Sequence, residues 1–263
     1  MDLGIKEKLA LVSGSTAGIG MATARALAND GASVIINGRS EAAVAAAIEI
    51  LQPQVSGNLL GFAGDLAKPE TIDRLAAQYP KVDILVNNLG IFEPAEFADI
   101  SDQDWYRFFE VNVMSGIRLS RLYLPGMKEQ NWGRIIFVSS ESAVQIPAEM
   151  IHYGMTKTAQ LAVARGMAES LAGTGITVNS VLPGPTRSRG VVDFVNQLAK
   201  DEGKSFEQFE QEFFEKVRPS SLIQRFAAPD EVASMIAYLC SSLASATTGA
   251  AVRADGGVVR AVV

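Results

Sequence analysis

Short runs of aliphatic and β-branched residues alternate with longer stretches of helical character along most of this chain. Residues 9–12 and 33–37 are runs of strand length, and each is followed by a helical stretch, at 18–30 and 41–52. The runs lack a polar alternation, so the pattern predicts βα units around a parallel sheet with helices on both faces. The same order continues with strands predicted at 59–63, 82–86, 134–138, 176–181 and 250–253, and helices at 69–78, 101–129, 152–172 and 230–241.

The chain is predicted to form a single domain over residues 1–263. No linker rich in Pro, Ser or Gly divides it, and no internal repeat is visible. The alternation breaks down at about 187–221, which we interpret as a helical excursion that carries the substrate loop. The phenylalanines of this excursion are expected either to line the substrate cleft or, equally, to pack a small helical pair. They are Phe194, Phe206, Phe209, Phe213 and Phe214.

The charge balance and the scarcity of His and Cys exclude several functions. With 23 Lys and Arg against 29 Asp and Glu, the formal net charge is −6, and nucleic-acid binding needs a basic surface. One cysteine, Cys240, cannot form an internal disulfide, and one histidine, His152, cannot build a zinc site, so no metal is expected. No signal-peptide pattern or membrane-spanning apolar run is visible, which indicates a cytoplasmic protein.

A glycine-rich turn follows the first predicted strand. Gly14, Gly18 and Gly20 have the spacing G-x3-G-x-G at the point where a helix begins. Such a turn brings backbone N–H groups and a helix N-terminus toward a phosphate, because the unpaired donors and the helix dipole both favour negative charge. The position predicts the pyrophosphate-binding turn of a dinucleotide site, and a turn that serves packing alone is the alternative.

The end of the second predicted strand, Asn37-Gly38-Arg39, bears on which dinucleotide is bound. A site for NAD presents a carboxylate to the ribose 2′-hydroxyl at this point, whereas a site for NADP presents an arginine to the 2′-phosphate. The arginine is present and the carboxylate is absent, which favours NADP(H). The rival is use of NAD(H), with Asn37 bonding the ribose and Arg39 stacking on adenine, and Arg39 could also be a solvated loop cation.

Candidate catalytic residues collect at the predicted carboxyl edge of the sheet. Tyr153 and Lys157 are four residues apart at the start of a helix, so the phenol and the ammonium share one face. Ser139 and Ser140 end the strand before that helix. Because the carboxyl ends of parallel strands meet at one edge, where α/β folds bind ligands, these side chains are expected to lie close together.

Together these motifs resemble the short-chain dehydrogenase/reductase family over essentially the whole chain. The resemblance implies a Rossmann-like α/β fold, a doubly wound parallel sheet of seven strands with helices on both faces. It also implies NAD(P) as the cofactor and a catalytic tetrad of Asn112, Ser140, Tyr153 and Lys157. We interpret Ser139 as a hydrogen-bonding residue at the strand end rather than as the catalytic serine. The motifs in the family's order and spacing are the glycine turn, Asn-Asn-x-Gly at 87–90, the tetrad and Pro183-Gly184.

The resemblance assigns cofactor contacts as well. Asp65-Leu66 is expected to lie along the adenine, and Thr186 to face the nicotinamide carboxamide. Leu89 and Ser188 stand where Ala and Thr are usual, and neither departure removes a catalytic group. The full set of expected contacts is Gly14, Ser15, Thr16, Gly18, Ile19, Gly20, Arg39, Asp65, Leu66, Asn88, Gly90, Tyr153, Lys157, Pro183, Gly184 and Thr186.

The expected chemistry interconverts a ketone or aldehyde and an alcohol. A carbonyl that receives hydride needs a proton, which Tyr153 could donate if its pKa fell from about 10 toward neutrality. Lys157 and the positive nicotinamide would favour the phenolate, and Ser140 would bond the carbonyl oxygen. By resemblance, Lys157 also grips the nicotinamide ribose and Asn112 positions a water beside it. The alternative for Asn112 is a buried helix residue bonded to the backbone.

Other functions on the same fold are less well supported. A non-catalytic dinucleotide sensor would be expected to lack the Tyr/Lys pair or the serine, and a cofactor-free lyase would lose the glycine turn. A dehydratase or epimerase normally carries a larger substrate domain than the residues after Pro183 allow. His152 is expected to be pocket wall, because no G-x-S-x-G elbow supports a hydrolase triad. Contact with an anionic substrate and exposure to solvent are equally compatible with Arg187, Arg189 and Arg218.

The expected partners are a small carbonyl or alcohol substrate and further copies of the chain, with no nucleic acid and no membrane. A homotetramer is predicted because the helices at 101–129 and 152–172 carry more apolar side chains than one sheet face readily covers. Family members pair these helices across a two-fold axis. The side chains expected on the outer faces are Met114, Ile117, Leu122, Leu161, Met167 and Leu171.

Overall fold

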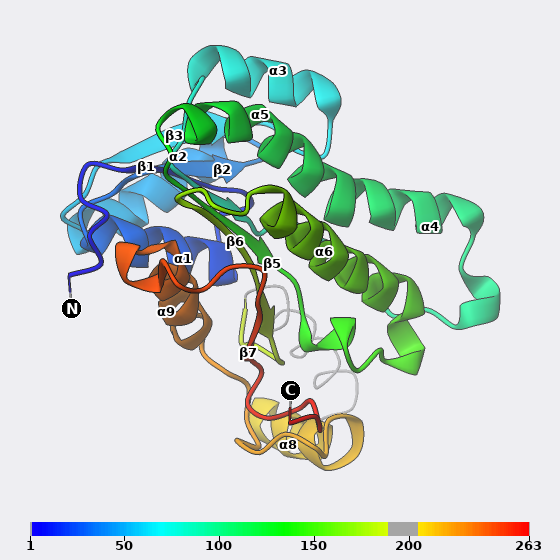
Figure 1. Cartoon of the computed structure of the whole chain (residues 1–263). Helices are drawn as coiled ribbons and strands as arrows, with labels where there is room; N and C mark the ends of the chain where they lie inside the picture. The colour runs from blue at the N-terminus through cyan, green and yellow to red at the C-terminus, as the bar shows by residue number, and fades with distance from the viewer. Residues whose placement is uncertain (1, 189–204, 263) are drawn as a thin grey trace.

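The computed structural model describes residues 2–188 and 205–262 and has a parallel sheet at its centre (Figure 1). Its seven strands are β1 (Leu9–Val12), β2 (Ser33–Gly38), β3 (Leu59–Ala63), β4 (Ile84–Asn87), β5 (Gly133–Val138), β6 (Ile176–Pro183) and β7 (Ala251–Ala254). They are ordered β3-β2-β1-β4-β5-β6-β7, and every neighbouring pair is parallel. The winding reverses between β1 and β4, and in such sheets the ligand crevice lies outside the carboxyl ends of the strands at the reversal.

Helices cover both faces of this sheet (Figure 1). One face packs against α1 (Gly18–Asn29), α2 (Glu41–Leu51) and α9 (Pro229–Cys240), and the other against α3 (Pro69–Gln78), α5 (Ser115–Glu129) and α6 (Ile151–Ser170). Two further helices, α4 (Asp102–Phe109) and α8 (Phe206–Glu212), extend beyond the sheet. The predicted doubly wound Rossmann-like fold of a single domain is confirmed.

The central strands are apolar at successive positions because both faces are buried. In β1, the side chains of Ala10 and Val12 join the core beneath α1, whereas Leu11 points into the core beneath α5, and all three are fully buried. Each large aliphatic side chain buried in this way contributes about 1.5–3 kcal/mol. Shifting the register by one residue would exchange the two faces, so the fit to both cores fixes the strand.

The predicted helix at 101–129 is present but is interrupted by a wider turn. Glu110–Met114 forms a π-helical turn between α4 and α5, and Ser101 caps the start of α4 by accepting a hydrogen bond from the Asp104 N–H. The interruption lies at Asn112, one of the predicted catalytic residues. π-Helical turns inside α-helices are frequent at functional sites because they free backbone groups from the regular ladder.

The phenylalanines after β6 pack against one another. Phe214 and Phe226 are buried, and the other rings of α8 and the following turn pack on them, which favours the small packed unit over a lined cleft. Phe194 and Arg189 lie outside the described residues. The excursion at 187–221 is described in part and stays a prediction as a substrate loop. The partly buried members of this cluster are Phe206, Phe209 and Phe213.

Of the side chains expected on the outer faces of the long helices, Leu171 is placed wrongly by the prediction. It is buried in the core beneath α6, because the chain turns back toward β6 directly after that helix. The others are partly buried, whereas α4 exposes two aromatic residues, Phe109 and Tyr106, of which Tyr106 is 75% exposed. Within residues 2–188 and 205–262, no helix has the length and hydrophobicity of a membrane span.

Candidate active site

The glycine turn joins β1 to α1 at the carboxyl edge of the sheet. Gly14 and Gly18 have φ values of 62° and 56°, which favour glycine, and a Cβ atom on Gly20 would lie 2.5 Å from the carbonyl oxygen of Gly14. Among the described residues, no side chain caps the start of α1 and none in its first turn is acidic. The N–H groups in the first turn of α1 are thus available to an anion, and the bare backbone lets a phosphate approach closely.

Two asparagines hold the turn in place. The Asn37 Oδ1 accepts a hydrogen bond from the Gly14 N–H at 3.0 Å, and its Nδ2 donates to the carbonyl oxygens of Phe62 and Gly64. From the other side, the Asn88 Nδ2 donates to the carbonyl oxygens of Ser13 and Gly14 at 2.9 and 3.0 Å. The alternative interpretation placed Asn37 at the ribose, whereas its amide ties β2 and β3 to the turn.

The residues expected beside the adenine lie along the ends of β2 and β3. Arg39 is exposed directly after β2, and a Cβ atom on Gly38 would lie 2.5 Å from the Thr16 Cγ2. After β3, the Asp65 Oδ1 accepts a hydrogen bond from the Ala67 N–H, and the side chain of Leu66 is buried in the core. The guanidinium of Arg39 is thus open to solvent at the end of β2. The neighbouring position, Gly38, is crowded, because a larger side chain there would clash with Thr16.

Ser140, Tyr153 and Lys157 come together at the end of β5. Burial raises the pKa of Tyr153, and a side-chain hydrogen bond with Ser140 lowers it by a smaller amount. This differs from the expected fall toward neutrality, because removal from water penalises the phenolate. The Lys157 Nζ lies 5.6 Å from the centroid of the Tyr153 ring, and burial lowers the pKa of Lys157 to about 7.

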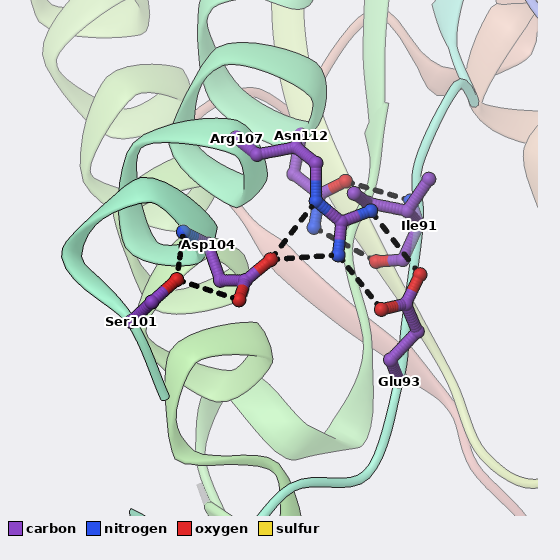
Figure 2. Close-up of polar contacts among 6 residues, drawn as sticks. All are labelled: Ile91, Glu93, Ser101, Asp104, Arg107 and Asn112. Carbon is purple, nitrogen blue, oxygen red and sulfur yellow. Dashed lines mark hydrogen bonds and ion pairs between the residues drawn. The ribbon is translucent and has the colours of Figure 1, made fainter. Parts of the chain in front are cut away.

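Asn112 clamps the segment that follows β4 (Figure 2). Its Oδ1 accepts a hydrogen bond from the Ile91 N–H at 2.7 Å, and its Nδ2 donates to the Ile91 carbonyl oxygen at 3.0 Å. The same Nδ2 also donates to the Thr156 Oγ1 on α6. The side chain thus bonds to the backbone, as in the alternative interpretation, and it ties the π-helical turn, α6 and the chain after β4 into one unit.

An ion pair fixes the same segment two residues further along (Figure 2). Arg107 of α4 donates to both carboxylate oxygens of Glu93, at 3.2 and 2.7 Å, and also contacts Asp104. This bonding lowers the pKa of Glu93 and raises the pKa of Arg107. Directly before Ile91 lies Gly90, which is exposed and whose Cβ, if present, would lie 3.4 Å from the Lys157 Nζ. A ligand can therefore approach the ammonium over bare backbone.

Gln160 is a polar contact of Lys157 that the sequence analysis missed. The Lys157 Nζ donates to the Val138 carbonyl oxygen at 2.9 Å and to the Gln160 Oε1 at 3.3 Å. The Gln160 Nε2 in turn donates to the carbonyl oxygen of Asn112, in the π-helical turn, at 2.6 Å. A side chain therefore links Lys157 directly to Asn112. The i,i+3 spacing from Lys157 is the signal that could have indicated it.

Glu141 is a second polar neighbour that the sequence analysis missed. The Ser140 hydroxyl donates to the Glu141 Oε2 at 2.5 Å and accepts from the Ser142 N–H at 3.1 Å. The Glu141 Oε1 accepts from the Arg218 Nε at 3.3 Å, and both side chains are largely buried. Arg218, which the sequence left between substrate contact and solvent, is thus paired with carboxylates.

The chain after β6 closes the other side of the site. Gly184 passes so close to Asp255 that a Cβ would lie 2.4 Å from its carbonyl oxygen, and the Thr186 Oγ1 donates to the Gly184 carbonyl oxygen at 2.9 Å. A Cβ on Gly18 would lie 3.1 Å from that of Ser188. The segment after Pro183 therefore lies against the glycine turn.

Two neighbours of the predicted tetrad have structural contacts. The Ser139 hydroxyl donates to the Lys157 carbonyl oxygen at 2.9 Å, which confirms it as a strand-end hydrogen-bond donor. His152 is buried between α4 and α6, with its ring 4.0 Å from that of Phe108 and 5.9 Å from that of Trp105. Burial lowers the pKa of His152, so its neutral ring packs the two helices together and is not the pocket wall that was expected.

Comparison with known proteins agrees with this arrangement. A family described as enoyl-(acyl carrier protein) reductase matches residues 14–259. YvaG of Bacillus subtilis (strain 168), named as an uncharacterized oxidoreductase, is 50% identical over 263 residues, which is 100% of each chain. D-beta-hydroxybutyrate dehydrogenase of Cupriavidus necator is 36% identical over 257 residues, covering 96% of this chain and 98% of that protein.

A solved structure matches the fold over its whole length. The crystal structure of L-sorbose reductase from Gluconobacter frateurii, complexed with NADPH and L-sorbose, is similar with a TM-score of 0.94 and 31% identity. The match covers 100% of both chains. The glycine turn, the Ser/Tyr/Lys cluster and these similarities lead to one conclusion: the chain is an oxidoreductase that belongs to the short-chain dehydrogenase/reductase family.

Proposed function

We propose that this enzyme interconverts a ketone or aldehyde and an alcohol with NADP(H) as the hydride carrier. The observation that carries the proposal is the convergence of Ser140, Tyr153 and Lys157 at the end of β5. They lie at the same sheet edge as an uncapped helix N-terminus. One edge thus offers proton donors for a carbonyl oxygen and an anion-binding turn, which are the two requirements of nicotinamide-dependent reduction.

The residues present fit a dinucleotide. The glycine turn leaves bare backbone and free N–H groups for the pyrophosphate, and Gly90 leaves the approach to Lys157 open. The similar L-sorbose reductase was crystallised with NADPH, which supports the assignment. When bound, the nicotinamide supplies the hydride to the carbonyl carbon or accepts it from the alcohol. The side chains around it then have to orient the substrate and move one proton.

Tyr153 gives that proton to the carbonyl oxygen in the direction of reduction. Ser140 donates a second hydrogen bond to the same oxygen and stabilises the negative charge that develops there. The Lys157 Nζ lies near the phenol ring, and with a pKa of about 7 it is about half protonated in neutral solution. Its positive charge then stabilises the phenolate that remains after proton transfer. In alcohol oxidation the same groups act in reverse.

The preference for NADP(H) is assigned to Arg39. A guanidinium at the end of β2 can meet the 2′-phosphate with charge-assisted hydrogen bonds. The contacts of Asn37 support this preference over NAD(H), because both of its amide hydrogens are used by the carbonyl oxygens of Phe62 and Gly64. Asn37 is thus poorly placed to donate to a free ribose hydroxyl.

The variant Arg39→Ala is expected to lower kcat/KM for NADPH by at least about tenfold, because the lost charge-assisted bonds are worth about 1.5–3 kcal/mol. With NADH, kcat/KM should stay within about twofold, since the lost contact is to the phosphate. Steady-state kinetics with both cofactors measure the two values. Equal use of NADH by the wild type, or an NADPH preference that survives in Arg39→Ala, contradicts the assignment.

A panel of ketones and aldehydes, followed by the absorbance of NADPH, tests the function. Carbonyl-dependent oxidation of NADPH is the expected result. A non-catalytic sensor would instead bind NADPH without turnover, and a dehydratase or epimerase would convert its substrate without net loss of NADPH. The presence of all three groups, Ser140, Tyr153 and Lys157, favours the reductase.

A homotetramer is also proposed. The chain mass is 28.0 kDa, so sedimentation at micromolar concentration should give about four times that value. The exposed rings of α4, Tyr106 and Phe109, support an assembly because large exposed apolar residues are commonly covered by a partner. A sedimentation mass near 28.0 kDa contradicts the proposal.

A further inference from the structure

The hydroxyl of Ser140 is already committed to a neighbour inside the chain. It donates its proton to the Glu141 Oε2 at 2.5 Å and accepts from the Ser142 N–H. A serine hydroxyl has a single proton, so it cannot donate to Glu141 and to a substrate carbonyl oxygen at once. To stabilise the developing oxyanion, Ser140 has to give up its bond to Glu141.

Glu141 itself is held firmly. Its side chain is 7% exposed, and its other oxygen accepts from the Arg218 Nε at 3.3 Å. Arg218 is anchored in turn by Glu149 and by its own contact with the Val217 carbonyl oxygen. The charge of Glu141 raises the pKa of Tyr153 and the charge of Arg218 lowers it. If Ser140 turned away, Glu141 Oε2 would be left as a buried charged acceptor without its donor, which is costly.

We propose that Glu141 is a specificity-determining residue that selects carbonyl substrates with a hydroxyl group on the carbon next to the carbonyl. The substrate hydroxyl donates to the Glu141 Oε2 in place of Ser140, and the freed Ser140 hydroxyl then donates to the carbonyl oxygen beside it. The two oxygens on adjacent carbons thus replace one internal hydrogen bond with two bonds to substrate. A plain ketone offers no donor to Glu141. Its carbonyl oxygen therefore has to compete with the Glu141 carboxylate for the single proton of the Ser140 hydroxyl. The inference rests on the proposed carbonyl reduction and names its substrate class.

Matched ketones test the inference. Hydroxyacetone and butanone differ by a hydroxyl in place of a methyl group, and dihydroxyacetone and pentan-3-one form a second pair. The wild type is expected to favour the hydroxylated member by at least about tenfold in kcat/KM, because a site built for a hydroxyl rejects the analogue without it. In Glu141→Gln this preference should fall at least about fivefold, since a neutral amide oxygen is a weaker acceptor than a carboxylate. The loss in kcat/KM should therefore be at least about fivefold larger for the hydroxylated ketone than for the plain ketone, because only the hydroxylated substrate donates to residue 141.

Glu149→Gln is the matched control. Glu149 is also a carboxylate partner of Arg218, but its side chain is 45% exposed, and within residues 2–188 and 205–262 it makes no hydrogen bond with Ser140. This variant should keep the wild-type preference within about twofold. If a general disturbance of Arg218 were the cause, the preference for the hydroxylated ketone would fall in both variants. The proposed role of Glu141 predicts a fall in Glu141→Gln alone.

Product inhibition gives a measurement that needs no variant. Propane-1,2-diol should inhibit the wild type at least about tenfold more strongly than butan-2-ol, since the diol carries the second donor. Equal inhibition by the two alcohols, no preference within the ketone pairs, or a preference that survives in Glu141→Gln overturns the inference and leaves carbonyl reduction standing. No turnover of any ketone by an enzyme that binds NADPH overturns the proposed function and this inference with it.

Discussion

Tyr153→Phe is expected to lower kcat for carbonyl reduction by at least about 100-fold, the size of effect typical of losing a general acid. The phenylalanine ring can keep the packing of the tyrosine, whose ring centroid lies 6.3 Å from that of Phe92 and 5.6 Å from the Lys157 Nζ. The variant therefore loses the proton donor with little change in shape. Affinity for NADPH should change by no more than about threefold, because the phenol acts on the substrate. Steady-state kinetics and NADPH fluorescence titration measure the two quantities.

Tyr106→Phe is the control for this substitution. Its side chain is 75% exposed on α4, so removal of its hydroxyl should leave kcat within about twofold of the wild type. A Tyr153→Phe enzyme that keeps more than about a tenth of wild-type turnover would show that another group supplies the proton. The assignment of Tyr153 would then be wrong.

Gly20→Ala is expected to destabilise the glycine turn and to weaken NADPH binding by at least about tenfold. The added methyl group would lie 2.5 Å from the carbonyl oxygen of Gly14 and 2.5 Å from the Asn88 Nδ2, and the first of these is backbone that cannot rotate away. Overpacking of this kind costs about 1–3 kcal/mol in the free energy of unfolding. The turn must open to relieve the clash, which moves the N–H groups that would hold the phosphate. Urea unfolding and NADPH titration test both effects.

Gly126→Ala provides the matched control. Gly126 lies inside α5, and a Cβ there would make ordinary contact with Lys81, at 3.5 Å. Because alanine is the better helix former, this variant should be unchanged or up to about 1 kcal/mol more stable, with unaltered NADPH affinity. Wild-type NADPH affinity in Gly20→Ala would contradict the role given to the turn.

The fold could be predicted from the sequence because burial on both faces leaves a strong pattern. Leu11 packs on one side of the sheet and its neighbours Ala10 and Val12 on the other, so β1 has no polar alternation at all. The helices that cover the two faces are equally visible in the sequence, as longer stretches of helical character between the strands. The π-helical turn at Glu110–Met114 could not be predicted, because it depends on contacts that Asn112 makes with distant residues.

The candidate site was predictable where chain geometry alone brings residues together. Ser140 ends a strand and Tyr153 begins the next helix, so both lie at the same edge. The contacts of Gln160 with Asn112 and of Glu141 with Arg218 were missed because they depend on which way each side chain turns and join residues far apart along the chain. Glu141, for example, meets Arg218 across 77 positions. Such pairs leave no local pattern in a single sequence.

The contacts of Asn37 differ from the alternative interpretation, in which its side chain bonds the ribose. Its position at the end of β2 suggested contact with the ribose, but its amide oxygen and amide hydrogens are used within the protein. A buried amide must satisfy its hydrogen bonds, and at 2% exposure Asn37 does so with backbone. The position of a residue along a strand therefore indicates which part of the fold it lies in, but it does not indicate which groups its side chain bonds to.

The transfer of deuterium from NADPH labelled at C4 of the nicotinamide tests the central claim most directly. The wild-type enzyme is incubated with hydroxyacetone and the labelled cofactor, and the product is analysed by mass spectrometry and NMR. The account predicts an alcohol that carries deuterium on the former carbonyl carbon, formed in equal amount to the NADPH oxidised. An alcohol without deuterium at that carbon, or NADPH loss without alcohol, would contradict the claim that this chain reduces a carbonyl by hydride transfer.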